Sequence, residues 1–208
     1  MKSFSRLTKG ELCKTENTKA CCDRAEHAGM LLFGAAVNRS AVRFVTENQD
    51  VLSAYAALSR RLGMEPAVYR NGDGAARYAA EIQDAVMIPR LLNELKLIDP
   101  STGVIRYRID PALVREDCCR RAFIKGAFLS GGTVIDPRKN YNLELVTPYL
   151  GLSREDALGC FDMAKSYPAP LTPKALESGD GVLYEAMIDG SITTSFSVRM
   201  VTLSGGSF

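Results

Sequence analysis

The sequence predicts an α+β fold in which one plan of helices and strands is built twice around a pseudo-two-fold axis. The first reason is a repeat: CCDRAEHAGMLLFGAAV (21–37) matches CCRRAFIKGAFLSGGTV (118–134) without a gap, 97 positions apart (118 minus 21). The second is that helix-like and strand-like patterns follow these two segments in the same order. A site on such an axis takes one contribution from each half.

In the first half, hydrophobic spacing and turn signals define each expected element. Phe4, Leu7 and Leu12 share one side of a short amphipathic helix, and Gly63 is a plausible end for a later one. The Asn-Gly-Asp-Gly run at 71–74 predicts a tight turn between two strands. The expected order is helix 3–14, motif helix 19–34, hairpin 35–38 with 41–47, helix 51–62, hairpin 66–70 with 76–82, and helix 86–97.

The second half repeats that order. It is expected to contain motif helix 118–131, hairpin 133–136 with 141–147, helix 153–166, two strands within 170–187, and a final helix over 188–203. The run SITTSFSV argues against this last helix, because β-branched and hydroxyl residues prefer strands. We expect one half over 1–98, an extended linker over 99–115, and the other half over 116–208.

The composition is that of a globular protein and argues against a membrane protein or a secreted one. A hydrophobic content of 46% and a charged content of 24% are ordinary for a globular chain, and the net charge of +2 neither requires nor excludes a polyanionic partner. No apolar run approaches the length of a membrane span, and the amino terminus lacks the apolar run of a secretory signal. We therefore expect a cytoplasmic protein with reduced cysteines and no membrane partner.

Each motif helix carries small residues four apart, Ala25 with Gly29 and Ala122 with Gly126. Glycine inside a helix costs about 1 kcal/mol relative to alanine, so its recurrence at matching places suggests a close approach of another backbone. We expect the two helices to pack against each other through these faces. The alternative is that each glycine only accommodates a neighbouring core side chain.

These residues resemble a known family. Helices with small-residue faces, each followed by a hairpin, a helix and a second hairpin, resemble the LAGLIDADG homing-endonuclease fold. The doubled CC-x-RA, with DP-x-K-x-Y-x-LELVT over 136–147, is more closely similar to WhiA-type transcription regulators of bacterial sporulation and cell division. The resemblance covers 3–150 well and 150–208 loosely. It implies a nucleoid-associated DNA regulator whose usual C-terminal helix-turn-helix domain is absent from this chain.

The same resemblance bears on catalysis. Active LAGLIDADG enzymes place one carboxylate near the end of each motif helix, where the pair holds divalent metal over the DNA. Those places are taken by Gly34 and Gly131, and the other acidic place of each motif by Leu32 and Leu129. We therefore expect no enzyme activity, no catalytic metal and no cofactor. Asp136 is the nearest carboxylate, and an Asp-Pro pair is typical of a hairpin turn.

In the resembled fold the hairpins form a saddle along the DNA duplex, so basic residues on strands and their turns are candidate phosphate contacts. The alternative is a scattered solvated surface, since glutamates lie on the same strands. The candidates are Arg43, Arg70, Arg77, Arg138, Lys139 and Lys174.

Cysteine and histidine are two further residue types that could form a site. Four cysteines, at 21, 22, 118 and 119, could meet and bind zinc, but vicinal pairs lack the usual ligand spacing, which favours buried thiols. His27, the only histidine, has no partner at readable spacing and is expected on a helix surface.

The sequence thus favours a catalytically silent, LAGLIDADG-like DNA-binding domain of a WhiA-like regulator, with double-stranded DNA as its partner. Two alternatives stay open. One is a metal-dependent site-specific endonuclease with relocated ligands. The other is a module that binds a protein or small ligand and passes a signal to a separate helix-turn-helix domain.

Overall fold

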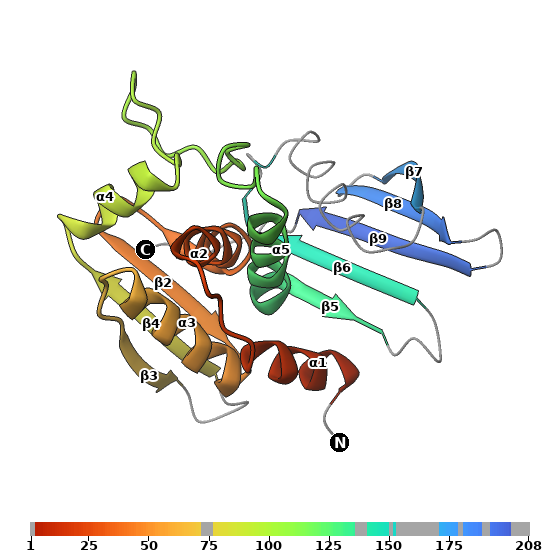
Figure 1. Cartoon of the computed structure of the whole chain (residues 1–208), viewed down its shortest axis with the longest axis horizontal. Coiled ribbons are helices and arrows are strands. Elements are labelled where there is room, and N and C mark those ends of the chain that lie inside the picture. Colours follow the sequence, from red (N-terminus) through yellow and green to blue (C-terminus); the bar gives the residue numbers. More distant parts are fainter. Residues whose placement is uncertain are drawn as a thin grey trace.

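Two fifteen-residue helices, α2 (Ala20–Gly34) and α5 (Asp117–Gly131), lie side by side at the centre of the molecule, with one β-sheet on each side (Figure 1). The structure is a computed structural model. It describes residues 3–71, 77–135, 141–149 and 152, and the backbone of strands 171–178, 181–188 and 192–200. None of the helices in these ranges is long and apolar enough to cross a membrane.

The first half follows the predicted order. Ser3 caps its first helix by accepting a hydrogen bond from the Arg6 amide at 3.2 Å, and Asn48 caps another through the Asp50 amide at 3.0 Å. Gly63, at φ +81°, ends that second helix as predicted. The elements are α1 (Phe4–Cys13), α2, β1 (Ala35–Val37), β2 (Ala41–Thr46), α3 (Gln49–Arg61), β3 (Ala67–Asn71), β4 (Arg77–Gln83) and α4 (Met87–Glu94). The strands form an antiparallel sheet in the order β1-β2-β4-β3.

The second half contains the predicted motif helix, the predicted hairpin and the two strands predicted within 170–187, and it departs from the plan over 188–203. Helix α5 leads into β5 (Gly132–Val134), β6 (Tyr141–Thr147), β7 (Leu171–Ser178), β8 (Gly181–Ile188) and β9 (Ile192–Met200), in a sheet of order β5-β6-β9-β8-β7. The final helix predicted over 188–203 is wrong, because the β-branched and hydroxyl residues there form β9, which runs parallel to β6. The helix predicted over 153–166 lies outside the described residues.

The linker folds back on itself and joins the body. Ile98 and Ile105 form an antiparallel bridge, and Asp99 is buried at its base with Ser101 and Arg106 as partners. Further along, the Tyr107 ring stacks on Tyr149 at a centroid distance of 3.7 Å. The linker therefore connects the halves and also packs on both.

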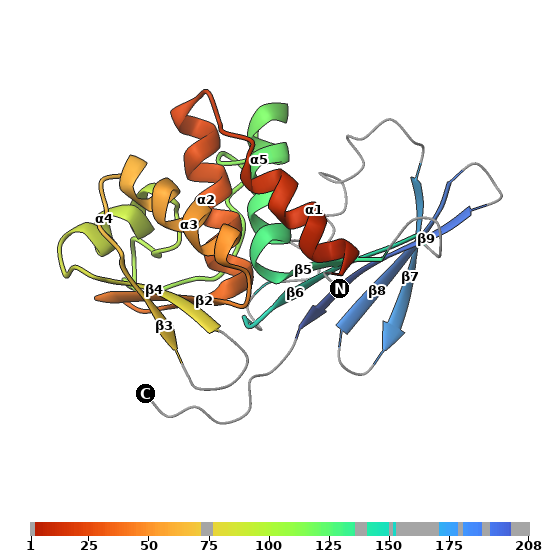
Figure 2. The same ribbon diagram turned by 90° about the horizontal axis from the view of Figure 1, so that it is seen from below.

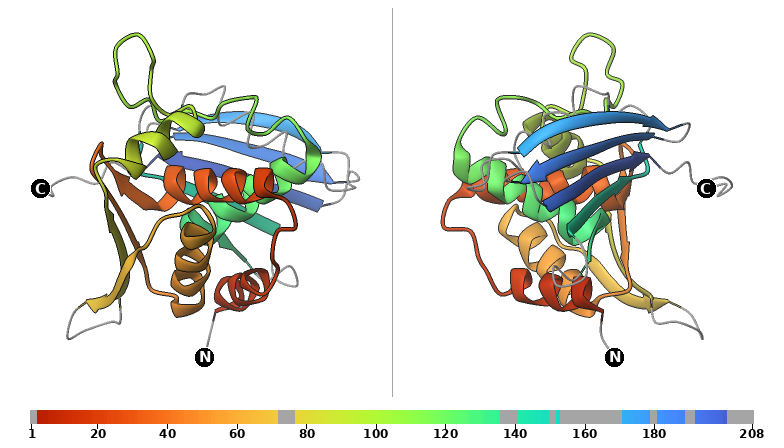
Figure 3. Two further views of the ribbon diagram at one scale, coloured as in Figure 1. Left: turned by 60° about the vertical axis from the view of Figure 1, so that its left-hand side comes forward. Right: turned by 90° about the vertical axis from the view of Figure 1, so that its right-hand side faces the viewer.

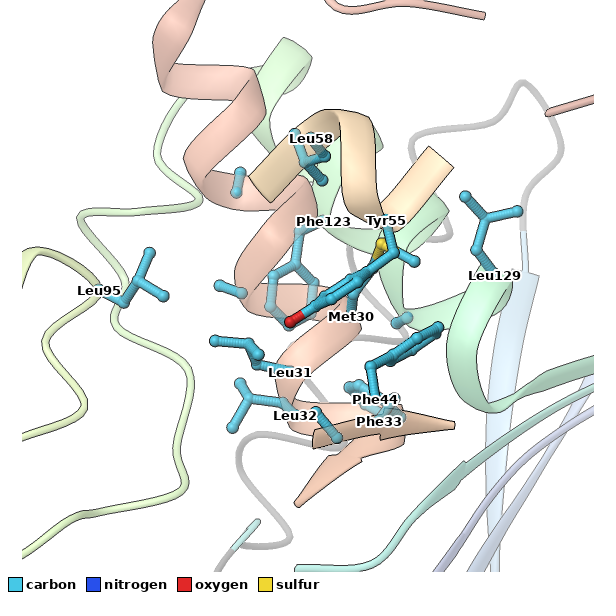
Figure 4. Packing of buried hydrophobic residues seen from close by; sticks show 14 of the residues in the cluster. Met30, Leu31, Leu32, Phe33, Phe44, Tyr55, Leu58, Leu95, Phe123 and Leu129 are labelled. Atoms are coloured by element: carbon cyan, nitrogen blue, oxygen red, sulfur yellow. The ribbon is translucent and has the colours of Figure 1, made fainter. Parts of the chain in front are cut away.

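The core is continuous from one half to the other. Figure 4 shows Phe123 of α5 among Met30, Leu31 and Tyr55 of the first half. The Phe44 and Tyr55 rings stack at 4.4 Å, which ties the sheet to α3. Since one set of apolar side chains serves both halves, the duplicated chain forms a single core.

His27 belongs to this core, so the prediction that it lies on a helix surface is wrong. Its exposed fraction is 0%, and its ring stacks on Tyr55 at 5.4 Å. The physical reason is that α2 is covered on several sides, by α5, by α3 and by the first sheet. A helix buried in this way has no solvent face at its centre.

Among the residues that the structure describes, the helices lie on one side of the two sheets and not on the other. In Figure 2, α2, α3, α4 and α5 lie above the two sheets, which spread to either side of the central pair. Figure 3 shows the same arrangement from two further sides. Helix α1 crosses this arrangement, contacting α3 in one half and both α5 and β5 in the other. The helix-free faces of the two sheets are thus the surfaces that an extended ligand could approach.

Candidate nucleic-acid interface and the ends of the central helices

The central helices approach each other through their small residues. A Cβ atom built on Gly29 would lie 2.3 Å from the Phe123 carbonyl oxygen, and one on Gly126 would lie 2.0 Å from the Glu26 carbonyl oxygen. Ala25 and Ala122 are both buried beside them. The backbones are therefore too close for any larger side chain at the two glycines.

The helix ends leave equally little room. A Cβ on Gly34 would lie 2.5 Å from the Ser130 Cβ, and one on Gly131 would lie 2.1 Å from the Val146 carbonyl oxygen. Leu32 and Leu129, each two residues before one of these glycines, are buried. Neither pair of places offers an oxygen ligand from a side chain. Asp136, the alternative carboxylate, lies outside the described residues.

The register of the first sheet sorts the predicted arginines between its two faces. Arg43 pairs with Glu81, and Arg77 stands four residues before Glu81 on the same strand, so both arginines lie on the helix-free face. Arg70 pairs with Tyr78 and therefore lies on the opposite face, near the edge of the sheet. All three side chains are exposed.

The helix-free face is not purely basic. The Tyr69 hydroxyl donates to Glu81 at 2.8 Å, and the Gln83 amide donates to the same carboxylate at 2.6 Å. These two hydrogen bonds, with the charge of Arg43, hold the pKa of Glu81 below its ordinary value. Arg43 therefore stands beside a carboxylate that stays ionised, which reduces the net charge it presents.

In the second sheet, a carboxylate stands at the place equivalent to Arg43. Ala36 pairs with Arg43, and its repeat equivalent Thr133 (36 plus 97) pairs with Glu144. Glu144 therefore occupies the place of Arg43, with the Thr133 hydroxyl 3.4 Å from its carboxylate. Lys174 pairs with Glu185 in register. Arg138 and Lys139 lie outside the described residues.

A cavity of about 570 Å³ opens beside this region, between α1 and the ends of β2, β4 and α5. Arg77 lines it from the sheet, and Arg6 and Lys9 line it from α1. Among the described residues of the lining, Glu47 is the one acidic side chain. Arg6 and Lys9 are not among the contacts predicted from the sequence. Their i, i+3 spacing on a capped helix places them on one face and could have revealed them.

Lys9 is the least solvated of these cations. Burial lowers the pKa of its ammonium group to about 8, and the nitrogen lies 5.5 Å from the centre of the Phe128 ring. An anion in the cavity would favour the charged form of Lys9. The cavity can thus hold a phosphate-sized anion among hydroxyl and cationic groups.

The four vicinal cysteines meet at the opposite ends of the central helices. Their Sγ atoms all lie within 4.8 Å of one another, and Cys22 and Cys119 are buried. Burial raises the pKa of the Cys22 thiol to about 11, whereas a hydrogen bond with Cys119 lowers the pKa of Cys21. The four thiols therefore meet, and both alternatives from the sequence, a zinc site and buried thiols packed against the opposite helix, remain compatible with this arrangement.

Comparison with known proteins identifies sequences that are similar to this chain. The family model described as the WhiA LAGLIDADG-like domain matches residues 120–157. A "Probable cell division protein WhiA" of Alkaliphilus metalliredigens is 31% identical over 176 residues, which cover 77% of this chain and 55% of the relative. The chain spans about half the length of the curated relatives it matches.

Solved structures show the same fold. The crystal structure of the N-terminal LAGLIDADG domain of DUF199/WhiA matches with a TM-score of 0.59 at 16% identity, over 86% of this chain and 82% of that one. A structure of I-DmoI in complex with its target DNA matches with a TM-score of 0.50 at 14% identity, over 81% and 87%. Sequence and fold together therefore assign this chain to the WhiA family, of which it carries the LAGLIDADG-like domain.

Proposed function

We propose that this chain binds double-stranded DNA without cutting it, as the LAGLIDADG-like core of a cytoplasmic, WhiA-type regulator of cell division and sporulation. The observation that carries the proposal is the position of Arg77, which belongs both to the helix-free sheet face with Arg43 and to the cavity with Arg6 and Lys9. One basic surface thus extends from the sheet to α1. The DNA complex of I-DmoI supports a duplex as the ligand of this fold.

The charges on this surface favour contacts to phosphate over contacts to bases. Arg43 has Glu81 beside it, and Glu144 stands at its equivalent in the second half, so the total positive charge is modest. A small number of phosphate contacts gives an affinity that falls with salt and depends little on sequence. We therefore expect weak, salt-sensitive binding by this chain alone, with target choice left to another domain.

The packing at Gly34 and Gly131 supports the proposal that the chain does not cleave DNA. A metal-dependent nuclease of this fold needs two converging oxygen ligands, one from each motif helix. Both places are glycines, and a Cβ at either would lie 2.5 Å or less from atoms of the other half. Installing an acid here would force the helices apart, so a simple exchange of residues would not restore the site.

The test is fluorescence anisotropy of a labelled duplex titrated with the chain at increasing salt. The wild-type chain should bind with an affinity that falls linearly with salt on logarithmic axes. Arg43→Gln with Arg77→Gln should weaken binding on every sequence and reduce the slope by about 1 per arginine. Arg70→Gln is the control for each arginine variant taken singly, since it removes one charge from the same sheet on the opposite face.

Three outcomes contradict the proposal. Binding that does not respond to salt would contradict contacts to DNA phosphates. If Arg70→Gln weakened binding as much as the double variant does, the DNA would not lie on the helix-free face. Nicking of supercoiled plasmid in Mg²⁺ or Mn²⁺ that disappears in Asp136→Asn would establish an endonuclease with relocated ligands.

A further inference from the structure

The N-terminal ends of α2 and α5 bring four thiols into one cluster. Cys21 and Cys22 lie in the first turn of α2, and Cys118 and Cys119 lie in the first turn of α5. All four Sγ atoms are within 4.8 Å of one another. Each pair is the repeat equivalent of the other, since 21 plus 97 gives 118 and 22 plus 97 gives 119. The cluster therefore lies on the axis that relates the halves.

The spacing of the sulfur atoms suits one tetrahedral ion. Zinc binds thiolate sulfur at about 2.3 Å, so four sulfurs around it lie about 3.8 Å apart. An upper limit of 4.8 Å means that each pair has to close by about 1 Å at most, which side-chain rotation can provide. An iron–sulfur cluster needs room for several irons and sulfides between the thiolates, and this group of sulfurs is too compact for one.

The surroundings can stabilise the charge of such a site. Four thiolates around a divalent cation carry a net charge of −2, and both helices present the positive ends of their dipoles to the cluster. Cys22 and Cys119 are buried, which excludes water, and Cys21 and Cys118 are half-buried, which leaves a path for entry. The cluster thus combines a dry interior with access from the surface.

We propose that Cys21, Cys22, Cys118 and Cys119 form a structural zinc site that joins the two halves of the domain. On binding, the four thiols release their protons and the ion takes four sulfur ligands, with no position left for water. The site clamps the central helices at the ends remote from Gly34 and Gly131. Because each sheet follows directly from one of these helices, the clamp also fixes the angle between the two sheets.

The test uses the whole chain, purified with reductant, stripped with a chelator and titrated with Zn²⁺ or Co²⁺. We expect one zinc per chain, and with cobalt a thiolate charge-transfer band together with the d–d bands of tetrahedral coordination. Zinc should also raise the melting temperature, since the ion binds only the folded state. Isothermal titration would give the affinity.

The variant is Cys21→Ser with Cys118→Ser, which removes one ligand from each half at the two half-buried places. It should lower the zinc affinity by more than the roughly hundred-fold that loss of an outer hydrogen bond can cost. Cys13→Ser is the matched control, because Cys13 lies outside the cluster, and it should bind zinc normally. Circular dichroism of the metal-free variants checks that both remain folded.

Several results would overturn the proposal. These are less than one zinc per chain in folded, reduced protein, equal loss of affinity in Cys13→Ser, or preference for iron over zinc when both are offered. A disulfide between α2 and α5, found by mass spectrometry in protein that takes up no metal when reduced, would identify the cluster as a redox pair. None of these measurements involves DNA, so failure here leaves the DNA-binding proposal intact.

Discussion

Gly29 and Gly126 make the same contact in opposite directions. A Cβ on Gly29 would meet the carbonyl oxygen of Phe123 and the amide nitrogen of Ala127, whereas a Cβ on Gly126 would meet the corresponding atoms of Glu26 and Met30. Residues 26 and 123, like residues 30 and 127, are 97 apart. The reciprocity shows that the sequence repeat is also a symmetry of the packing.

Replacing either glycine by alanine should destabilise the domain. The added methyl group would lie 2.3 Å or 2.0 Å from a backbone oxygen, which cannot move without separating the helices. Overpacking of this kind typically costs about 1–3 kcal/mol or more, so we expect a loss near the upper end for Gly126→Ala. Urea unfolding followed by circular dichroism measures the change.

Gly10→Ala is the matched control for this prediction. Gly10 also lies inside a helix, but a Cβ there would only contact an Asp50 oxygen at 3.5 Å. The substitution should therefore stabilise the chain by about 0.5–1 kcal/mol through the helix propensity of alanine. If Gly126→Ala behaved like Gly10→Ala, the close approach of the two helices would be incorrect.

The repeat and the small-residue spacing were readable from the sequence because both depend on residue order alone. The face on which Arg70 lies was not, since β3 is an edge strand in which the apolar Val68 is itself 47% exposed. Alternation in such a strand does not mark the buried side. The strand β9 was missed because the repeat suggested a helix there, and the local preference of its residues prevailed.

His27 should titrate far below its ordinary pKa of 6.5. Burial lowers the pKa of the imidazole to about 4. Ser59 donates its proton to the Tyr55 carbonyl oxygen at 2.9 Å, so the Nε2 atom of His27, 3.3 Å from Ser59 Oγ, donates to that hydroxyl. Nδ1 has no partner, and a proton there would be buried without an acceptor. As the only histidine, His27 gives unambiguous ring signals in an NMR titration.

This shift makes the free energy of unfolding depend on pH. Between pH 6.5 and about 4 the unfolded chain binds a proton at His27 that the folded chain does not. Stability contributed by His27 is therefore complete above pH 6.5 and is lost as the pH falls toward 4, by at most about 1.4 kcal/mol per pH unit. His27→Phe should remove this part of the slope. An unchanged slope in that variant would assign it to carboxylates alone.

Tyr149 should contribute more than Tyr107 to the stability of β1. The Tyr149 hydroxyl accepts from the Val37 amide at 3.0 Å and donates to the Ala35 carbonyl, whereas the Tyr107 hydroxyl only donates to the Val37 carbonyl at 2.9 Å. Tyr149→Phe leaves an amide without its acceptor, which costs about 1–3 kcal/mol, and Tyr107→Phe should cost less. Hydrogen exchange at the Val37 amide should accelerate in Tyr149→Phe. Equal exchange in the two variants would contradict the assignment.

The ion pair between Lys125 and Glu26 should contribute far more to the free energy of unfolding than the exposed pair between Lys14 and Glu11 does. Lys125 donates to Glu26 at 3.1 Å and to the Thr15 carbonyl at 2.6 Å, and the two side chains of the pair are only 14% and 5% exposed. Lys125→Met leaves the Glu26 carboxylate buried with Asn17 as its remaining partner, at a cost of about 3–5 kcal/mol.

The Lys14–Glu11 pair, at 2.8 Å but with side chains 70% and 75% exposed, provides the comparison for Lys125. Solvent screens this pair, so Lys14→Met should change the free energy of unfolding far less than Lys125→Met does. Adding Glu26→Gln to Lys125→Met should recover part of the loss, because the uncompensated charge is then gone. If the double variant were as unstable as Lys125→Met, packing of the lysine chain and its bond to Thr15, rather than charge, would account for the loss.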